Sequence, residues 1–267
     1  MRIRQIAGAL GAELLDIDLS SRLTTIQIRE IRQALLDHCV IFFRDQTITP
    51  DQQIAFARAF GEVVEYPMIK PLPNHPEIIP VVKEADEKVN FGGLWHTDTA
   101  YLAQPPLGSI LLAKEVPPFG GDTLFANGYL AYEALSKGLK SALAPLNAVN
   151  RSGGASVAKT RGASAAAEEK TATHPVIRTH PETGRKSLYV NLAHTCRFDG
   201  MTEAESAPLL SYLFQHQIRP EFTCRFSWRK GSMAFWDNRC TLHNPVNDYH
   251  GHRRVMHRIT IAGDTPV

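Results

Sequence analysis

Long hydrophobic runs are missing from this 267-residue sequence, and so are other features of membrane and secreted proteins. No stretch approaches the roughly 18 apolar residues of a membrane-spanning helix, and the first residues lack the apolar core of a secretory signal. We therefore expect a cytoplasmic protein without a membrane partner.

An excess of charge of either sign is also missing. The chain has 29 basic and 27 acidic residues, for a formal net charge of +2, which gives no general attraction to nucleic acid. The basic residues form no stripe, and aromatic residues are not interleaved with them, so nothing predicts a nucleic-acid partner. The partner that we expect is a small molecule, bound by a protein that forms a homo-oligomer.

Cysteine is scarce and scattered along the chain. None of the four positions shows the Cys-X-X-Cys spacing of zinc sites and redox motifs. This favours reduced thiols packed in a core over a metal site or a disulfide framework. The four positions are Cys39, Cys196, Cys224 and Cys240.

Many short strands and a few helices are present instead. Strand patterns occupy, among others, residues 40–43, 107–114, 123–126, 233–236 and 254–261. Helical patterns occupy residues 25–38, 49–60, 128–139 and 202–217. This arrangement predicts a mainly β (α+β) fold, a β-sandwich or open barrel with flanking helices, in a single domain spanning 1–267.

The segment 151–173 differs in composition from its surroundings. It is rich in glycine, alanine and serine and poor in apolar anchors, which is typical of mobile chain. A linker between domains is one interpretation. We favour a mobile lid, because strand patterns resume on both sides of it.

Metal-ligand chemistry is indicated by the sequence Trp-His-Thr-Asp-Thr. Side chains two residues apart on a strand point to the same side, so His96 and Asp98 could converge on one ion. Two imidazoles and one carboxylate can occupy one face of Fe(II) and leave positions open for a co-substrate and O2. A His-X-Asp alone is weak evidence, since two polar residues on a surface strand look the same.

Further motifs make the sequence similar to a known family. Gly-Gly-Asp-Thr ends at Thr123, Trp-Asp-Asn-Arg-Cys-Thr-Leu-His ends at His243, and Arg-Val-Met-His-Arg begins at Arg254. With Trp-His-Thr-Asp, these motifs resemble the taurine dioxygenase (TauD/TfdA-like) family of Fe(II)/2-oxoglutarate-dependent dioxygenases. The resemblance covers nearly the whole chain and implies a double-stranded β-helix, or jelly roll, as the core.

The resemblance also implies roles for five residues. The iron ligands would be His96, Asp98 and His243. Thr123 and Arg254 would bind the distal carboxylate of 2-oxoglutarate, and a planar guanidinium suits bidentate recognition of a carboxylate. A structural ion pair is the alternative role for Arg254.

Substrate recognition is predicted less sharply. Arg258 lies four positions after Arg254 and would face the same side of a strand. The matching arginine of taurine dioxygenase holds the substrate sulfonate, so an anionic substrate is expected, with a structural role for Arg258 as the alternative. A loop containing Tyr66, Lys70 and His75 lies where the family places another anion-binding histidine. His194 either lines the pocket or is a core histidine.

One departure from the family concerns the substrate itself. Taurine dioxygenase has a polar Asn/Asp-rich run before Trp-His-Thr-Asp that helps to hold the substrate amine, whereas this chain has Asn-Phe-Gly-Gly-Leu at 90–94. Glycine and leucine cannot bind an ammonium group. We therefore expect an alkylsulfonate, sulfate ester or aryloxyalkanoate, with succinate and CO2 as co-products and fragmentation of the hydroxylated product.

Three alternatives stay open at this point. Hydroxylation of a stable C–H bond in a biosynthetic or amino-acid pathway would use the same chemistry without fragmentation. A jelly-roll binding protein or isomerase would have no oxidative turnover, and a zinc hydrolase could share the metal ligands. Neither of the last two explains Thr123 and Arg254.

Overall fold

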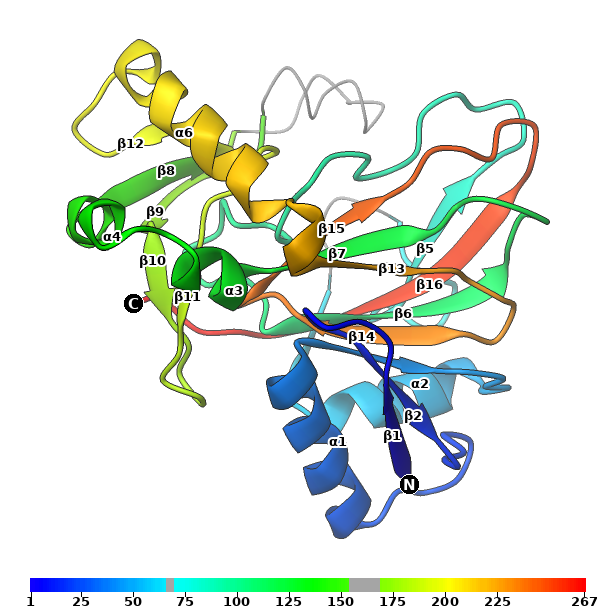
Figure 1. The fold of residues 1–267 in the computed structure, drawn as a ribbon. Coiled ribbons are helices and arrows are strands. Elements are labelled where there is room, and N and C mark those ends of the chain that lie inside the picture. The colour runs from blue at the N-terminus through cyan, green and yellow to red at the C-terminus, as the bar shows by residue number, and fades with distance from the viewer. Residues whose placement is uncertain (66–69, 154–168) are drawn as a thin grey trace.

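Two sheets that face each other form the centre of the molecule (Figure 1). The structure is a computed structural model and describes residues 1–65, 70–153 and 169–267. The larger sheet contains, in spatial order, β1 (Arg2–Gln5), β2 (Ala12–Leu15), β3 (Val40–Phe43), β14 (Met233–Asp237), β6 (Gly108–Glu115), β16 (Arg254–Ile261) and β4 (Val63–Val64), with β5 (Ile79–Lys83) also paired to β16. The smaller sheet contains β13 (Thr223–Phe226), β7 (Thr123–Asn127) and β15 (Thr241–Pro245).

Aromatic side chains fill the space between these sheets. Phe42 of β3 stacks on Phe226 of β13 with 3.9 Å between ring centroids, and its edge meets Phe125 of β7 at 5.7 Å. All three are fully buried or nearly so, and burial contributes about 1.5–3 kcal/mol for each such side chain. The predicted double-stranded β-helix core is confirmed.

Two helices cover the outer face of the larger sheet, below it in Figure 1. They are α1 (Thr25–His38) and α2 (Pro50–Arg58), and each begins with a capping box, at Thr24 and Thr49 respectively. Buried residues of both helices, among them Ile31 and Phe56, pack against the sheet. Both sequence-predicted helices are confirmed.

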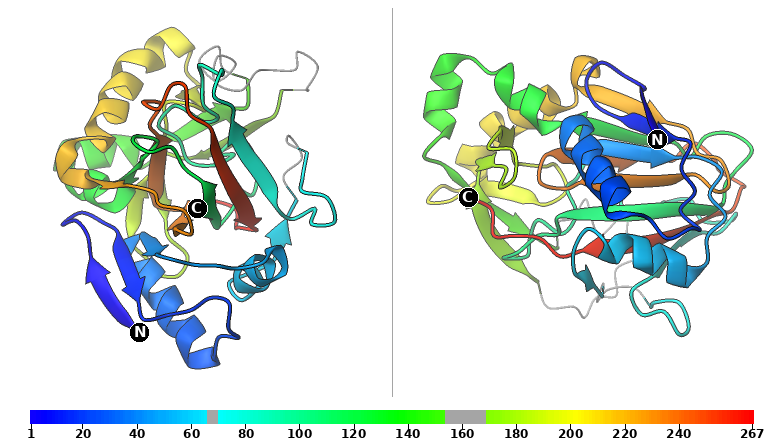
Figure 2. Two further views of the ribbon diagram at one scale, coloured as in Figure 1. Left: turned by 90° about the vertical axis from the view of Figure 1, so that its right-hand side faces the viewer. Right: turned by 90° about the horizontal axis from the view of Figure 1, so that it is seen from below.

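A further group of helices and strands lies at one end of the two sheets, and Figure 2 shows it from two further sides. Its helices are α3 (Gly128–Glu133), α4 (Lys137–Leu143), α6 (Glu203–Gln217) and the short η1 (Pro220–Phe222). Its strands are β8 (Asn147–Arg151), β9 (Thr171–Pro175), β12 (Thr195–Phe198) and the hairpin of β10 (Ile177–Thr179) with β11 (Lys186–Leu188). An apolar cluster, which includes Leu143, Phe198 and Leu213, joins these elements.

The structure corrects three details of the sequence prediction. The single helix expected over 128–139 is two helices, because Ser136 caps a new start by accepting from Leu139 N. Both ends of the predicted lid, 151–173, belong to strands, since Arg151 ends β8 and Thr171 begins β9; its middle part, 154–168, lies outside the described residues. His96 forms an isolated bridge to His243 in place of a strand.

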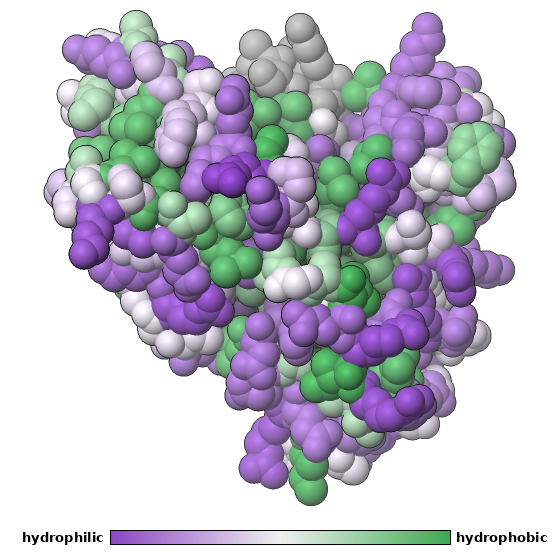
Figure 3. All heavy atoms as spheres, in the orientation of Figure 1, coloured by the Kyte–Doolittle hydropathy of each residue, from purple (hydrophilic) through white to green (hydrophobic). Residues whose placement is uncertain are grey.

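No helix in the described part of the chain is long and apolar enough to cross a membrane. Figure 3 shows polar side chains over much of one face, with apolar ones gathered mainly toward its upper left and centre.

Candidate active site

Three side chains predicted as metal ligands meet at the edge of the smaller sheet. His243 lies on β15, and its backbone exchanges two hydrogen bonds with that of His96. The Oδ1 atom of Asp98 lies 3.6 Å from His96 Nε2 and 3.7 Å from His243 Nε2. All three side chains are buried, and their ligand atoms lie within 4.8 Å of one another. A single ion could contact all three.

The protonation of this group suits a cation. His96 Nδ1 lies 2.6 Å from the carbonyl oxygen of Leu94, so Nδ1 carries a hydrogen, and Nε2 is the ring atom that faces Asp98. Burial, with His96 beside it, holds the pKa of His243 well below its ordinary value. Burial alone would raise the pKa of Asp98, but Arg258 and His243 hold it well below its ordinary value. These directions favour a neutral His243 imidazole and an ionised Asp98 carboxylate, the forms that bind metals.

The second oxygen of Asp98 is held by two donors. Arg258 Nη2 lies 2.8 Å from Asp98 Oδ2, and the Ser109 hydroxyl donates to the same oxygen at 2.8 Å. Arg258 Nη2 also donates to Ser109 Oγ at 3.1 Å. Arg258 thus contacts a predicted metal ligand and is buried beside it.

Arg254 is a buried cation that forms no ion pair with any described residue. Its side chain is 5% exposed, and its Nε and Nη2 atoms have no hydrogen-bond partner among the described residues. Burial lowers its pKa, while Tyr249 and Asp122 act in the opposite direction. Buried charges are normally paired. This arrangement fits an anion as the missing partner.

Thr123 and Trp228 lie beside this guanidinium. The Trp228 ring centroid is 5.8 Å from the Arg254 Cζ, and Trp228 Nε1 donates to Thr123 Oγ1 at 3.0 Å. Because Thr123 Oγ1 accepts this hydrogen bond, its own hydrogen can be directed toward an anion. Both predicted 2-oxoglutarate residues therefore face one place.

A cavity joins the two groups. Its wall includes His96, His243, Thr123, Arg254 and Arg258. A carboxylate at Arg254 and a metal at the histidines would thus share one space. The residues present fit Fe(II) with 2-oxoglutarate.

Gly92 also lines this cavity and was not predicted from the sequence. It has φ +73°, and a Cβ there would lie 3.1 Å from His96 Cε1. Glycine is therefore needed for both its conformation and its lack of a side chain. The Gly-Gly pair before Leu-Trp-His was the only sequence signal for it.

Of the other predicted substrate residues that the structure describes, His194 lies close to the metal ligands, and His75 and Lys70 do not. The His194 ring is buried and lies between Tyr101, at 5.0 Å between centroids, and His96, at 6.3 Å. His75 instead contacts Asp51 near the start of α2, at 3.2 Å, and Lys70 is exposed. The structure does not bring these two to the cavity. Tyr66 lies outside the described residues.

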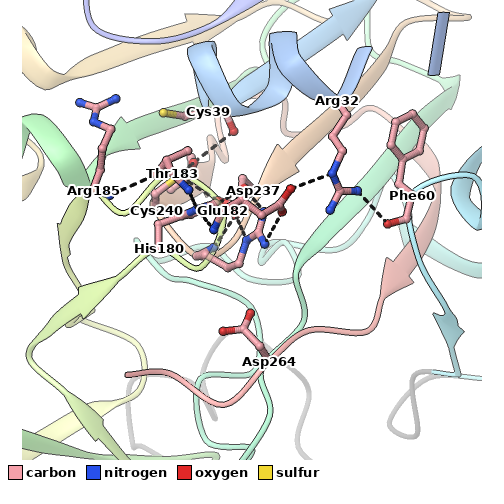
Figure 4. A network of polar contacts seen from close by, with 12 residues as sticks. Arg32, Cys39, Phe60, His180, Glu182, Thr183, Arg185, Asp237, Cys240 and Asp264 are labelled. Carbon is pink, nitrogen blue, oxygen red and sulfur yellow. Dashed lines mark hydrogen bonds and ion pairs between the residues drawn. The ribbon is translucent and has the colours of Figure 1, made fainter. Parts of the chain in front are cut away.

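A second group of metal-binding residue types, His180, Asp237 and Cys240, lies in a polar network (Figure 4). Both Asp237 oxygens accept hydrogen bonds from Arg239, and Oδ2 also lies 3.0 Å from His180 Nε2. Because His180 Nδ1 accepts from two backbone N–H groups, Nε2 must carry the hydrogen. Arg239 and His180 donate to the Asp237 carboxylate oxygens, so these oxygens are not free to bind a metal.

This network links three parts of the fold. Glu182 accepts from Arg239 at 2.7 Å and from Arg32 of α1 at 2.8 Å. It therefore ties α1 and the β10–β11 turn to the turn that precedes β15. We read it as structural support for the strand that carries His243.

Comparison with known proteins agrees with this geometry. The family model described as "Taurine catabolism dioxygenase TauD, TfdA family" matches residues 2–260. An alkylsulfatase of Acinetobacter baylyi is 36% identical over 277 aligned positions, covering 99% of this chain and 86% of that protein. An alpha-ketoglutarate-dependent 2,4-dichlorophenoxyacetate dioxygenase of Cupriavidus pinatubonensis is 34% identical over 278 positions, covering 97% of this chain and 96% of that protein.

The fold agrees as well. The crystal structure of a taurine dioxygenase from Burkholderia xenovorans is similar with a TM-score of 0.86 and 37% identity, covering 100% of this chain and 92% of that one. The chain belongs to the TauD/TfdA family and is a dioxygenase that uses Fe(II), 2-oxoglutarate and O2.

Proposed function

We propose that the protein hydroxylates a small organic anion with an apolar group, and that a sulfate ester is its substrate class. In this proposal His96, Asp98 and His243 hold Fe(II), and Arg254 with Thr123 holds the distal carboxylate of 2-oxoglutarate. The observation that carries the 2-oxoglutarate assignment is the buried Arg254 guanidinium, whose Nε and Nη2 have no hydrogen-bond partner among the described residues.

Bound Fe(II) with 2-oxoglutarate and O2 supplies the oxidising power for hydroxylation, with succinate and CO2 as co-products. The protein's own groups bind, orient and exclude water. Arg254 and Thr123 fix one end of the co-substrate, which sets the direction of the other end toward the histidines. The walls of the cavity limit the approach of water to the reacting carbon.

A second cavity supports an apolar substrate group. It has a volume of about 300 Å³, and apolar side chains form one part of its wall. The rest of the wall is Gly263 and the polar or charged side chains of Glu65, Thr99, Gln104, Lys170 and Thr260. The apolar wall consists of Val64, Tyr101, Leu102, Pro106 and Ala262. This volume lies within the range of small-molecule sites.

The strand register supports a position for this cavity beside the proposed iron site. Thr260, in its wall, is paired with Ser109 on one side and Val64 on the other. Ser109 contacts Asp98, and neighbouring strands lie only about 5 Å apart. Arg258 precedes Thr260 by two residues and faces the same side of β16. An anion bound at Arg258 would therefore have its apolar group near the second cavity.

The similarity to an alkylsulfatase favours the sulfate ester over the other anions. Hydroxylation of the carbon that bears the ester oxygen gives a product that falls apart to an aldehyde and inorganic sulfate. Arg258 would neutralise the sulfate group, as arginine commonly does for oxyanions.

Anaerobic addition of Fe(II) and 2-oxoglutarate to the apoprotein tests the co-substrate site. We expect the weak visible charge-transfer band of the chelate in the wild type and its loss in His243→Ala and Arg254→Ala. Arg253→Ala is the matched control, because Arg253 is exposed and pairs with Glu84 and Glu115. A wild-type protein without the band would refute the assignment.

Turnover tests the substrate class. With a medium-chain alkyl sulfate, succinate and inorganic sulfate should form in equal amounts, and taurine should give neither. Ala262→Phe, which fills the second cavity, should shift the preference to shorter chains. Succinate formed only with 2,4-dichlorophenoxyacetate would replace the sulfate ester by an aryloxyalkanoate.

A further inference from the structure

Asp98 lies where the local backbone cannot fix its side chain. It belongs to a turn, whereas His243 lies on β15 and His96 is bridged to that strand. The next residue, Thr99, has φ 43°, which is rare for a β-branched residue. Strained conformations of this kind persist only where their surroundings hold them. The orientation of the Asp98 carboxylate therefore depends on contacts from other elements.

Ser109 provides such a contact from the centre of the larger sheet. It is the second residue of β6, has 0% exposure, and pairs with Trp236 of β14 on one side and Thr260 of β16 on the other. A strand held on both sides is a more rigid support than a loop. The hydrogen bond from Ser109 Oγ to Asp98 Oδ2, at 2.8 Å, thus joins the turn to the sheet.

The neighbours of Ser109 fix the direction of this hydrogen bond. Its oxygen accepts from Arg258 Nη2 at 3.1 Å and from Asn238 Nδ2 at 3.5 Å. The Asn238 amide cannot be reversed, because its Oδ1 accepts from Trp236 Nε1 at 3.0 Å. A hydroxyl has one hydrogen and two lone pairs. With both lone pairs used, the hydrogen of Ser109 is directed to Asp98.

The consequence is an unequal carboxylate. Ser109 and Arg258 both occupy Oδ2, while Oδ1 faces the two histidine nitrogens. A carboxylate can bind a metal through one oxygen or both, and binding through both would use a position needed for co-substrate or O2. We propose that Ser109 is a positioning residue that holds Asp98 so that only Oδ1 binds the metal.

This inference rests on the proposed metal ligands, and it separates Ser109 from Arg258. If Arg258 turns toward a substrate anion, it gives up its contact with Asp98 Oδ2. The Ser109 hydroxyl then remains as the donor that keeps Asp98 in place.

Calorimetric titration of the apoprotein with Mn(II) tests the inference without turnover. We expect Ser109→Ala to bind Mn(II) about 10–100-fold more weakly than the wild type, as for other residues that orient metal ligands. The Mn(II)-loaded variant should also bind 2-oxoglutarate more weakly, because Asp98 Oδ2 then keeps only its contact with Arg258, and the less constrained carboxylate can turn both oxygens toward the metal. Ser206→Ala is the matched control, since it removes another hydroxyl of 0% exposure, in α6.

The melting temperature of each metal-free variant checks that it is folded. Unchanged Mn(II) affinity in Ser109→Ala would overturn the inference, and so would an equal loss in Ser206→Ala, which would indicate a general effect of losing a buried hydroxyl. Failure of the wild type to bind Mn(II) would overturn the proposed ligands themselves.

Discussion

Individual residues in this site are constrained by what stands next to them as much as by their own chemistry. Gly92 is an example, because a methyl group there would press on the ring of His96. The effect is separable from the cost of the backbone conformation. Gly184 has φ +68° with nothing within 4 Å of an added Cβ, so it shares the conformation without the contact.

We predict that Gly92→Ala weakens Mn(II) binding by about tenfold, because a displaced His96 can no longer present Nε2 at the same place. Both Gly92→Ala and Gly184→Ala should lower the free energy of unfolding by about 1–2 kcal/mol, the usual cost of a left-handed conformation. Calorimetry and urea unfolding measure the two quantities. Equal metal affinity in the two variants would contradict the role of the contact.

At the scale of elements, α6 shows that stability and site chemistry can be separated. Thr202 accepts from Glu205 N at 3.2 Å, and the Glu205 side chain accepts from Thr202 N at 2.8 Å. This reciprocal cap lies at the start of a helix whose buried leucines pack into the apolar cluster of Leu143, Phe198 and Leu213.

Thr202→Ala should lower the free energy of unfolding by about 1 kcal/mol through loss of the cap. The chelate band should keep its intensity, because α6 contributes no residue to the iron cavity. Ser211→Ala, at an exposed position in the middle of the same helix, should change stability little. A weaker band in Thr202→Ala would show that α6 is coupled to the site.

Elements with strong local signals were predictable from the sequence. The bounds of α1, β3 and β16 agree with the residues expected. A threonine cap defines the start of α1, β3 is a short apolar run, and β16 is rich in β-branched residues. The break between α3 and α4 was missed because the apolar pattern continues across Ser136. The turn at Asp98 was missed because its geometry depends on Ser109 and Asn238, which lie far away in the sequence.

At the scale of the whole molecule, the site lies where one edge of the smaller sheet meets the larger sheet. The two histidines lie on or beside β15 at the edge of the smaller sheet, and Arg254, Arg258 and Ser109 lie on strands of the larger sheet. The motifs of the family resemblance predicted which chemistry this meeting point serves. Pairing of Arg258 with Asp98 could not be predicted, because it depends on how closely the two sheets approach. The expected homo-oligomer stays a prediction.

The tryptophans have an optical consequence. The chain has three tryptophans. The ring centroids of Trp236 and His243 lie 4.7 Å apart, Trp228 donates a hydrogen bond to Thr123, and Trp95 directly precedes His96. The tryptophan fluorescence of the protein therefore arises from residues at or next to the proposed iron and 2-oxoglutarate positions, so the molecule carries its own reporter of ligand occupancy without a dye or label.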